Sequence, residues 1–275
     1  MSDTGPYLRS LFDLSGKHVF LTGASSGLGR HFARTLASAG ARVAMAARSV
    51  DKMSALADDI RAAGGLCDVY ALDVRDREAI RATVVVAEAV APIDALVNNA
   101  GVARPRAPER LGDAEWDEVY ETNLRGPWVL AQAVITARLA DGRGCSIINI
   151  ASVLGIRAIG HLAPYSAAKA GLINLGRDLC VDLAAKDIRI NALAPGYFIT
   201  EMNDEWLACD SEVDARTIAT AHVLEYEALA QTRLGDEFAA ELERTADVLQ
   251  EHRMRFGARR LRRFAQKLRL QPTGS

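Results

Sequence analysis

Six short apolar runs, separated by segments with helical spacing, constrain the fold of this chain more than any other feature. Strands that are apolar along their whole length are typical of parallel sheets covered by helices on both faces. Regular alternation of such strands with helices predicts an α/β fold, a Rossmann-type doubly wound parallel sheet. The six predicted strands span residues 17–21, 41–47, 67–72, 93–97, 145–150 and 188–193.

The composition excludes several classes of protein. With 275 residues and 49% hydrophobic side chains, the chain can bury one large core. A formal net charge of -2 gives no reason to expect nucleic acid or a membrane as a partner. The four cysteines contain no CxxC pair and the five histidines form no cluster, so no metal site is predicted. No leader pattern opens the chain and no apolar run reaches about 18 residues, and we therefore expect a cytoplasmic protein.

A glycine-rich loop, TGASSGLG, follows the first predicted strand and opens a helix. Glycines permit a tight turn here and let the backbone N–H groups of a helix N-terminus approach a pyrophosphate. This context predicts a dinucleotide site more specifically than a glycine pattern alone. The predicted phosphate-binding residues are Thr22, Gly23, Ser25, Ser26, Gly27, Leu28 and Gly29.

The ends of the second and third strands bear on the choice of cofactor. Rossmann sites that bind NAD place an acidic residue about 20 positions after the glycine loop, but this chain has Arg48 there. An arginine can pair with a 2′-phosphate, so the sequence favours NADP, with NAD as the alternative. Arg48 could instead be a solvated residue that stacks on adenine. Asp73 and Val74 follow the third strand and are candidate adenine contacts, although Asp73 could equally be a turn or helix cap.

Several motifs occur together in one order: the loop at 22–29, the NNAG segment at 98–101, Asn123, Ser152, the YSAAK segment at 165–169 and the PG pair at 195–196. In this the chain resembles the short-chain dehydrogenases/reductases, in their compact group without a separate substrate domain. The resemblance covers about residues 14–203. It implies a small-molecule carbonyl or alcohol substrate.

The resemblance also implies a catalytic set. Tyr165 exchanges a proton with the substrate oxygen, Ser152 hydrogen-bonds that oxygen, and Asn123 supports a water that relays protons to Lys169. A tyrosine with a pKa near ~10 needs a neighbouring positive charge to act as a base. Lys169 lies one helical turn after Tyr165, so we expect it to lower the tyrosine pKa and to hold the nicotinamide ribose. The alternatives are a chance Tyr–Lys spacing, a cap role for Ser152 and a backbone-satisfying role for Asn123.

Further contacts follow from the same resemblance. Asn98 and Asn99 are expected to brace the loop and the cofactor ribose, and Ile199 and Thr200 to meet the nicotinamide carboxamide. Arg157, His161 and Tyr197 lie in segments expected to flank a substrate pocket, and His161 is either a specificity residue or a solvated loop histidine. The remaining predicted cofactor contacts are Ala100, Gly101, Tyr165, Lys169, Pro195 and Gly196. The long helices around Asn123 and Tyr165 are expected to form a homodimer or homotetramer.

The last quarter of the chain departs from the family pattern. Residues 201–251 are strongly acidic, and the charges of residues 252–275 are all basic. Residues 211–270 have helical spacing and no apolar run that could be a seventh strand, so the seventh strand is doubtful. We therefore divide the chain into an NAD(P)-binding domain with the catalytic site, 1–203, and an atypical helical segment, 204–275, with a lid and a basic tail. A helical extension whose charges pair, a changed reading frame and a tail that contacts RNA or anionic lipid are the alternative explanations.

The sequence thus predicts an NADP-preferring oxidoreductase. It transfers a hydride between nicotinamide and a carbonyl or secondary alcohol carbon, with Tyr165 as general acid and base. The alternative is a catalytically silent NAD(P)-binding protein, because the C-terminal segment differs from that of the family.

Overall fold

The computed structural model describes residues 12–196 and Glu201. The expectations for Tyr197, Ile199, Thr200 and the segment 204–275 lie outside these residues. Within the described part, no helix is both long enough and apolar enough to cross a membrane.

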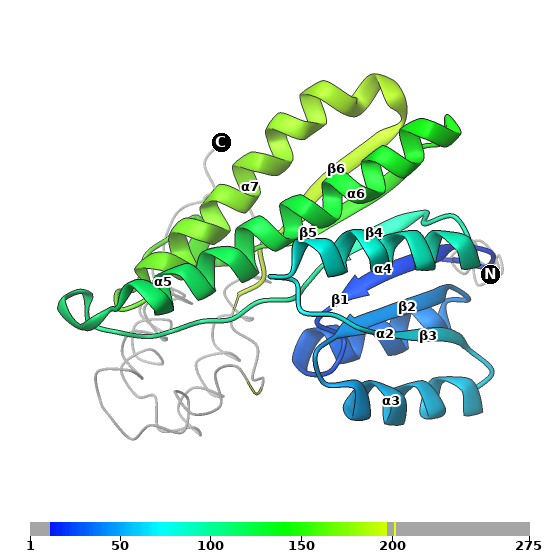
Figure 1. Cartoon of the computed structure of the whole chain (residues 1–275), viewed down its shortest axis with the longest axis horizontal. Helices are drawn as coiled ribbons and strands as arrows, with labels where there is room; N and C mark the ends of the chain where they lie inside the picture. The colour runs from blue at the N-terminus through cyan, green and yellow to red at the C-terminus, as the bar shows by residue number, and fades with distance from the viewer. Residues whose placement is uncertain (1–11, 197–200, 202–275) are drawn as a thin grey trace, which may run out of the picture. The chain divides into compact units, whose positions relative to one another are not determined.

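Six parallel strands form one sheet in the order β3-β2-β1-β4-β5-β6, which confirms the predicted doubly wound fold (Figure 1). Strand order reverses at β1, which pairs with β2 on one side and β4 on the other. The strands are β1 (His18–Thr22), β2 (Arg42–Ala47), β3 (Leu66–Ala71), β4 (Ala95–Asn98), β5 (Cys145–Ile150) and β6 (Ile188–Leu193).

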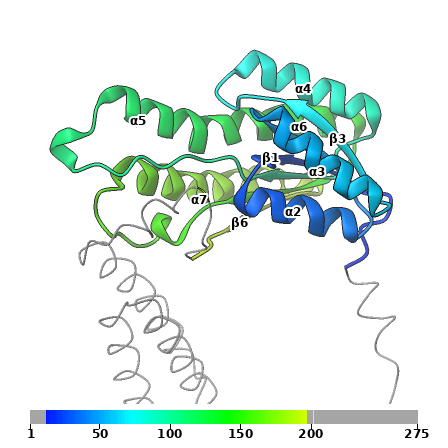
Figure 2. The same ribbon diagram turned by 90° about the horizontal axis from the view of Figure 1, so that it is seen from below.

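Helices connect the strands and cover both faces of the sheet. Two hydrophobic clusters hold them: α2 and α3 pack on one face, and α4 and α6 pack on the other. Figure 2 shows the sheet between α4 and α2. The main helices are α2 (Gly27–Ser38), α3 (Val50–Ala62), α4 (Arg77–Val90), α5 (Asp113–Tyr120), α6 (Gly126–Asp141) and α7 (Ala163–Leu183). Single turns are the 3₁₀ segments η1 (Pro108–Arg110), η3 (Val153–Gly155) and η4 (Ala184–Lys186), and the π turn η2 (Glu121–Arg125).

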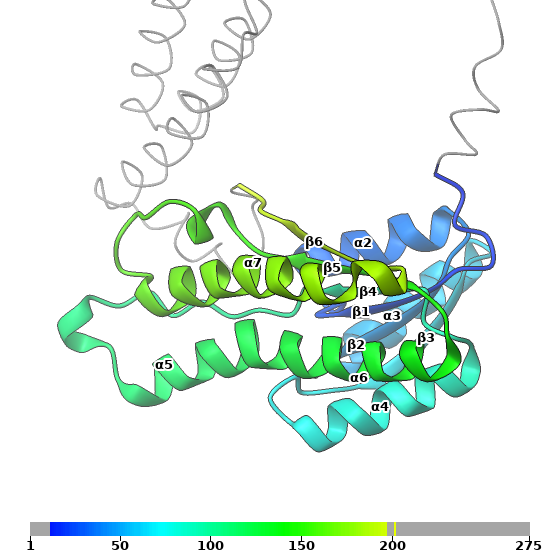
Figure 3. The ribbon, with the colours of Figure 1, turned by 90° about the horizontal axis from the view of Figure 1, so that it is seen from above.

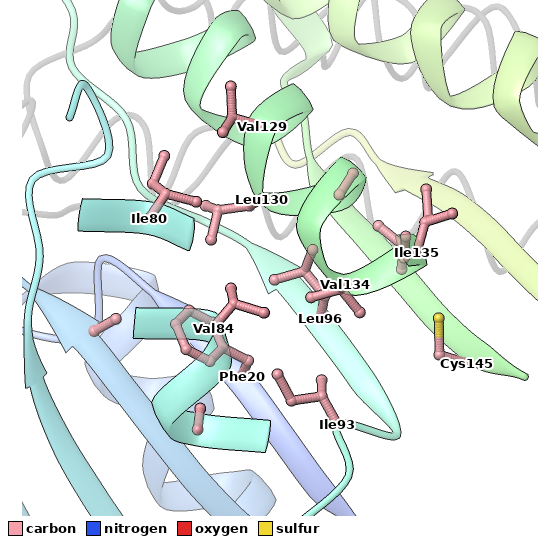
Figure 4. Packing of buried hydrophobic residues seen from close by; sticks show 14 of the residues in the cluster. Phe20, Ile80, Val84, Ile93, Leu96, Val129, Leu130, Val134, Ile135 and Cys145 are labelled. Atoms are coloured by element: carbon pink, nitrogen blue, oxygen red, sulfur yellow. The ribbon is translucent and has the colours of Figure 1, made fainter. Parts of the chain in front are cut away.

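The larger cluster lies between the sheet and the helices α4 and α6 (Figure 4). Phe20 of β1 and Leu96 of β4 meet Ile80 and Val84 of α4 and Val134 of α6, and all five are almost fully buried. Burying a side chain of this size stabilises the fold by about 1.5–3 kcal/mol before the entropy cost of ordering it. This packing fixes the strand ends, from which the candidate site is built.

A charged group is buried at the junction of α4 and α6. Arg138 has 2% of its side chain exposed, and its guanidinium pairs with Glu88 of α4 and with Asp141 of its own helix, the latter at 3.0 Å. Burial raises the pKa of Glu88, and the charge of Arg138 opposes this rise. The two carboxylates therefore compensate a cation that could not otherwise remain in the interior.

We predict that Glu88→Gln lowers the free energy of unfolding by about 2–4 kcal/mol, because the buried guanidinium keeps only the half-exposed Asp141 as a charged partner. Urea denaturation measures this. The control is Asp59→Asn, which breaks the exposed Arg34–Asp59 pair and should cost about 0–1 kcal/mol. Equal losses in the two variants would contradict the prediction.

Candidate active site

The carboxyl ends of β1 and β4 meet where the strand order reverses, the position at which doubly wound sheets bind ligands. The glycine loop follows β1, and residues 98–101 follow β4. Thr22 joins the two segments: its hydroxyl oxygen accepts from the N–H groups of Asn99 at 3.0 Å and Ala100 at 3.1 Å. The Asn99 side chain donates back to the carbonyl of Thr22 at 2.9 Å. The bracing role expected of Asn99 is therefore visible as a link between the two loops.

Close packing in this region requires glycine. Gly23 has a φ of 68°, and a Cβ atom there would lie 2.8 Å from the Cα of Ala100. A Cβ on Gly29 would collide with the carbonyl of Gly23 and the side chain of Asn99. The glycines therefore allow the α2 N-terminus to approach the segment that follows β4.

The N-terminus of α2 already holds an anionic group. The N–H of Gly27 donates to a carboxylate oxygen of Glu201 at 2.9 Å, while the N-cap residue Ser26 provides no side-chain cap. A helix N-terminus with a partial positive charge favours such a contact. The loop thus fits the pyrophosphate of a dinucleotide, which would replace Glu201 there. Sequence reasoning missed Glu201, because nothing in the sequence links it to a loop 174 residues earlier.

The adenine end of the predicted cofactor site lies at the ends of β2 and β3. Ala47 and Ala71 are register partners, so Arg48 and Asp73 follow neighbouring strand ends. Arg48 is exposed. Asp73 accepts from the backbone N–H of Arg75 at 3.0 Å, which is the turn role that the sequence left open as an alternative. The helix cap is instead Asp76, which accepts from Ala79.

A π turn, η2, lies between α5 and α6, where the sequence predicts one long helix around Asn123. In this turn Asn123 is fully buried, and its amide exchanges two hydrogen bonds with the backbone of Val102, at 2.8 and 2.7 Å. The backbone-satisfying alternative therefore describes what this side chain does. Asn123 nevertheless lies near Lys169, another member of the predicted catalytic set. Both side chains lie beside Gly101: the position that a Cβ atom would take there is 3.0 Å from Asn123 Oδ1 and 3.7 Å from Lys169 Nζ. π turns of this kind often mark functional sites.

The start of α7 brings the remaining predicted residues together. Lys169 is 3% exposed, its Nζ donates to the carbonyl of Ile150 at the end of β5 at 2.7 Å, and it lies 5.7 Å from the ring centroid of Tyr165. Ser152 follows β5 and accepts from the N–H of Leu154 at 3.1 Å, so it caps η3 as its alternative stated. The Ser152 hydroxyl is also within hydrogen-bonding reach of the Tyr165 phenol.

Burial controls the titration of this pair. It lowers the pKa of Lys169 to about 8 and raises the pKa of Tyr165, although the hydrogen bond with Ser152 opposes the rise for Tyr165. In the cofactor-free chain burial therefore outweighs any lowering of the tyrosine pKa by Lys169, and the expected effect of Lys169 stays a prediction for the cofactor-bound protein. The reason is physical: desolvation disfavours both charged forms, the ammonium and the phenolate.

The other predicted residues have simpler surroundings. Val74 is buried, and its carbonyl lies against Gly126 at the start of α6. The carbonyl of Pro195 accepts from Val153 at 2.9 Å. His161 is exposed with a φ of 56°, and its backbone carbonyl accepts from Arg106, so the observed interaction is made by its backbone. Among residues 12–196 and Glu201, no group of acidic, histidine and cysteine side chains could hold a metal.

We predict that Lys169→Met raises the free energy of unfolding at pH 7 by about 1–3 kcal/mol, because it removes a buried charge at the loss of one hydrogen bond. The folded pKa of about 8 lies below the usual 10.5, so between these pH values the unfolded chain binds more protons and wild-type stability rises with pH. The advantage of the variant should therefore disappear by about pH 10.5. Chemical denaturation between pH 7 and about pH 10.5 measures this, with Lys186→Met, at an exposed lysine, as the control. A stability difference between Lys169→Met and wild type that does not change with pH would refute the prediction.

Comparison with known proteins agrees with this geometry. The family described as short chain dehydrogenase matches residues 17–210. Gluconate 5-dehydrogenase of Gluconobacter oxydans (strain 621H) is 36% identical over 205 residues, covering 74% of this chain and 80% of that protein. The 3-oxoacyl-(acyl-carrier-protein) reductase of Escherichia coli (strain K12) is 39% identical over 192 residues, covering 69% and 77%.

A solved structure gives the same result in three dimensions. A metagenomic short-chain oxidoreductase in complex with NADP superposes with a TM-score of 0.63 and 39% identity, covering 67% of this chain and 84% of that one. The fold, the order of the motifs and these matches lead to one conclusion: the chain belongs to the short-chain dehydrogenase/reductase family and is an oxidoreductase.

Proposed function

We propose that this chain is an NADP-preferring oxidoreductase that interconverts a carbonyl group and a secondary alcohol, with Tyr165 as the general acid and base. The observation that carries the proposal is the convergence of three elements on one point: α7 with Tyr165 and Lys169, the end of β5 with Ser152, and the π turn with Asn123. The NADP complex of the metagenomic relative and Arg48 in place of an acidic residue both support NADP.

The bound dinucleotide supplies or accepts the hydride, and the side chains of this chain manage the proton. Because burial raises the pKa of Tyr165, its phenol is protonated at neutral pH and can donate to a developing alkoxide. Ser152, within reach of that phenol, can hold the same substrate oxygen. Lys169, with a pKa of about 8, can gain or lose a proton near neutrality, so it can return a proton towards the tyrosine.

The proposed substrate class follows from this proton chemistry and not from the shape of a substrate pocket. One relative is named for gluconate and another for a 3-oxoacyl group, two compounds with little in common beyond an oxidisable or reducible carbon. We therefore propose a small-molecule carbonyl or secondary alcohol as substrate. The free thiols of Cys67, Cys145 and Cys180 support a reducing, cytoplasmic setting.

We further propose that two copies associate through α7 and the continuous helical run of α5, η2 and α6, against which α7 packs at α5 and η2 (Figure 3). This surface has a hollow of about 560 Å³, lined by Tyr120, Glu121, Leu124, Arg125, Trp128, Gly171 and Leu175. Trp116 stacks on Tyr120 with 4.9 Å between ring centroids, and the side chains of Trp116 and Trp128 are each more than one third exposed. Exposed aromatic side chains around a hollow are typical of protein interfaces.

Turnover with the purified protein tests the proposed function. With NADPH and a panel of carbonyl compounds, Tyr165→Phe should lower kcat by at least about 100-fold, because the proton donor is removed. Its affinity for NADPH, followed by nicotinamide fluorescence, should stay within about twofold of wild type. Tyr70→Phe is the matched control, since Tyr70 stacks on Phe20 away from the site. Cofactor binding without any Tyr165-dependent turnover would favour the silent binding protein instead.

Light scattering tests the proposed association. Wild type at micromolar concentration should be a dimer or tetramer, and Trp128→Glu should shift it to monomer by burying a charge in the interface. Val85→Glu, on the exposed face of α4, should leave the molecular mass unchanged. A wild-type monomer would contradict the assembly.

A further inference from the structure

A second arginine acts on the adenine end of the predicted cofactor site. Arg75 follows Asp73 by two residues, and its guanidinium clasps the Asp73 carboxylate from the side. Nε lies 3.0 and 3.1 Å from the two carboxylate oxygens, and Nη2 lies 2.6 Å from Oδ2. The backbone N–H of Arg75 adds a further bond to Oδ1 at 3.0 Å. Such fork-like pairs are stronger and better oriented than single contacts between charges.

The clasped carboxylate is a neighbour of Arg48. Leu72 donates to the carbonyl of Ala47 at 3.0 Å, which ties the end of β3 to the end of β2. The hydrogen bond from Arg75 lowers the pKa of Asp73, and the charge of Arg48 contributes to this shift. Asp73 is therefore ionised under any physiological condition, close to the arginine that distinguishes NADP from NAD in the proposed function.

An ionised Asp73 by itself works against a preference for NADP. A phosphate monoester carries about -1.5 to -2 charges at pH 7, so an uncompensated carboxylate beside Arg48 repels it and cancels the attraction of Arg48. Arg75 supplies the compensating charge. The nearby carboxylate of Glu118 does not compete for it, because Glu118 is held by Arg104 through two contacts of 2.8 and 2.9 Å.

We infer that Arg75 is a specificity-determining positioning residue: it neutralises and orients Asp73 so that a 2′-phosphate, and not only a 2′-hydroxyl, is accepted beside Arg48. The inference rests on the proposed function, in that it concerns the same cofactor site. It assigns the preference for NADP to a trio of side chains, Arg48, Asp73 and Arg75, with one net positive charge.

The dissociation constants of NADPH and NADH, measured by nicotinamide fluorescence without substrate, test this inference. Arg75→Gln should weaken NADPH by about 3- to 10-fold, the effect of one lost charge at the rim of the site, and leave NADH within about twofold. Arg75→Lys, which keeps the charge, should retain most of the preference. Asp73→Asn should change the NADPH to NADH ratio in the direction opposite to Arg75→Gln, and the double variant should return near the wild-type ratio.

The matched control is Arg42→Gln. Arg42 of β2 pairs with Asp68 of β3 at 2.9 Å, and the side chains of this pair are about as exposed as those of Arg75 and Asp73. The Arg42–Asp68 pair lies towards the opposite end of the strands. Arg42→Gln should leave both affinities unchanged, which separates a local effect from a change in total charge. Arg48→Ala, in the same assay, shows the full loss of selectivity for comparison.

The outcomes are distinct. If wild type binds neither cofactor, the proposed function fails. If wild type prefers NADPH and Arg75→Gln weakens both cofactors equally, or neither, Arg75 has only a structural role or none, and the inference is overturned. If Arg75→Gln folds poorly, which a lowered melting temperature would show, Arg75→Lys and Asp73→Asn test the inference instead. The inference is then overturned if the preference for NADPH over NADH falls in Arg75→Lys as far as in Arg48→Ala. It is also overturned if this preference is unchanged in Asp73→Asn.

Discussion

The Thr22 hydroxyl, held between two strand ends, is the contact on which the site depends. Strand order reverses at β1, so the loops after β1 and β4 diverge and leave a crevice between them. Thr22 closes the base of this crevice by accepting two backbone N–H groups from the β4 loop and donating to Val97 at 3.4 Å. Buried backbone donors must be paired, and a single hydroxyl pairs two of them here. The glycine loop can then approach the β4 loop at a distance that no Cβ atom tolerates.

The proposed catalytic end of the site is built at a cost in stability. Lys169 is a buried ammonium whose nearest partner is a neutral carbonyl, and its lowered pKa measures the penalty. The fold tolerates it because the hydrophobic clusters on both faces of the sheet hold β5 and α7 in place independently of the lysine. Arg138 is different: it is equally buried but is paired with two carboxylates. An uncompensated buried charge is useful only where a proton must move.

Much of the fold could be predicted from the sequence, because apolar runs of strand length must be buried and glycines must occupy tight turns. The six strands appear within two residues of their predicted positions. The π turn at Asn123 could not be predicted, since the Asn123 side chain is held by the backbone of Val102, 21 residues away, and this contact leaves no local signal. The raised pKa of Tyr165 in the cofactor-free chain could not be predicted for a related reason. Spacing places the two charges together, but only the tertiary structure shows that both are desolvated.

The proposed cofactor site has two positions at which a carboxylate of the chain meets a positively charged partner, and the two positions differ. At the N-terminus of α2, Glu201 contacts the N–H of Gly27, so a pyrophosphate gains that donor only when the carboxylate leaves. At the ends of β2 and β3, the carboxylate of Asp73 stays and is neutralised in place by Arg75. At the first position, a carboxylate with one negative charge would be exchanged for a pyrophosphate with two. At the second position Asp73 and Arg75 are paired before any ligand binds, and we propose that this fixed arrangement discriminates between ligands that differ by one phosphate.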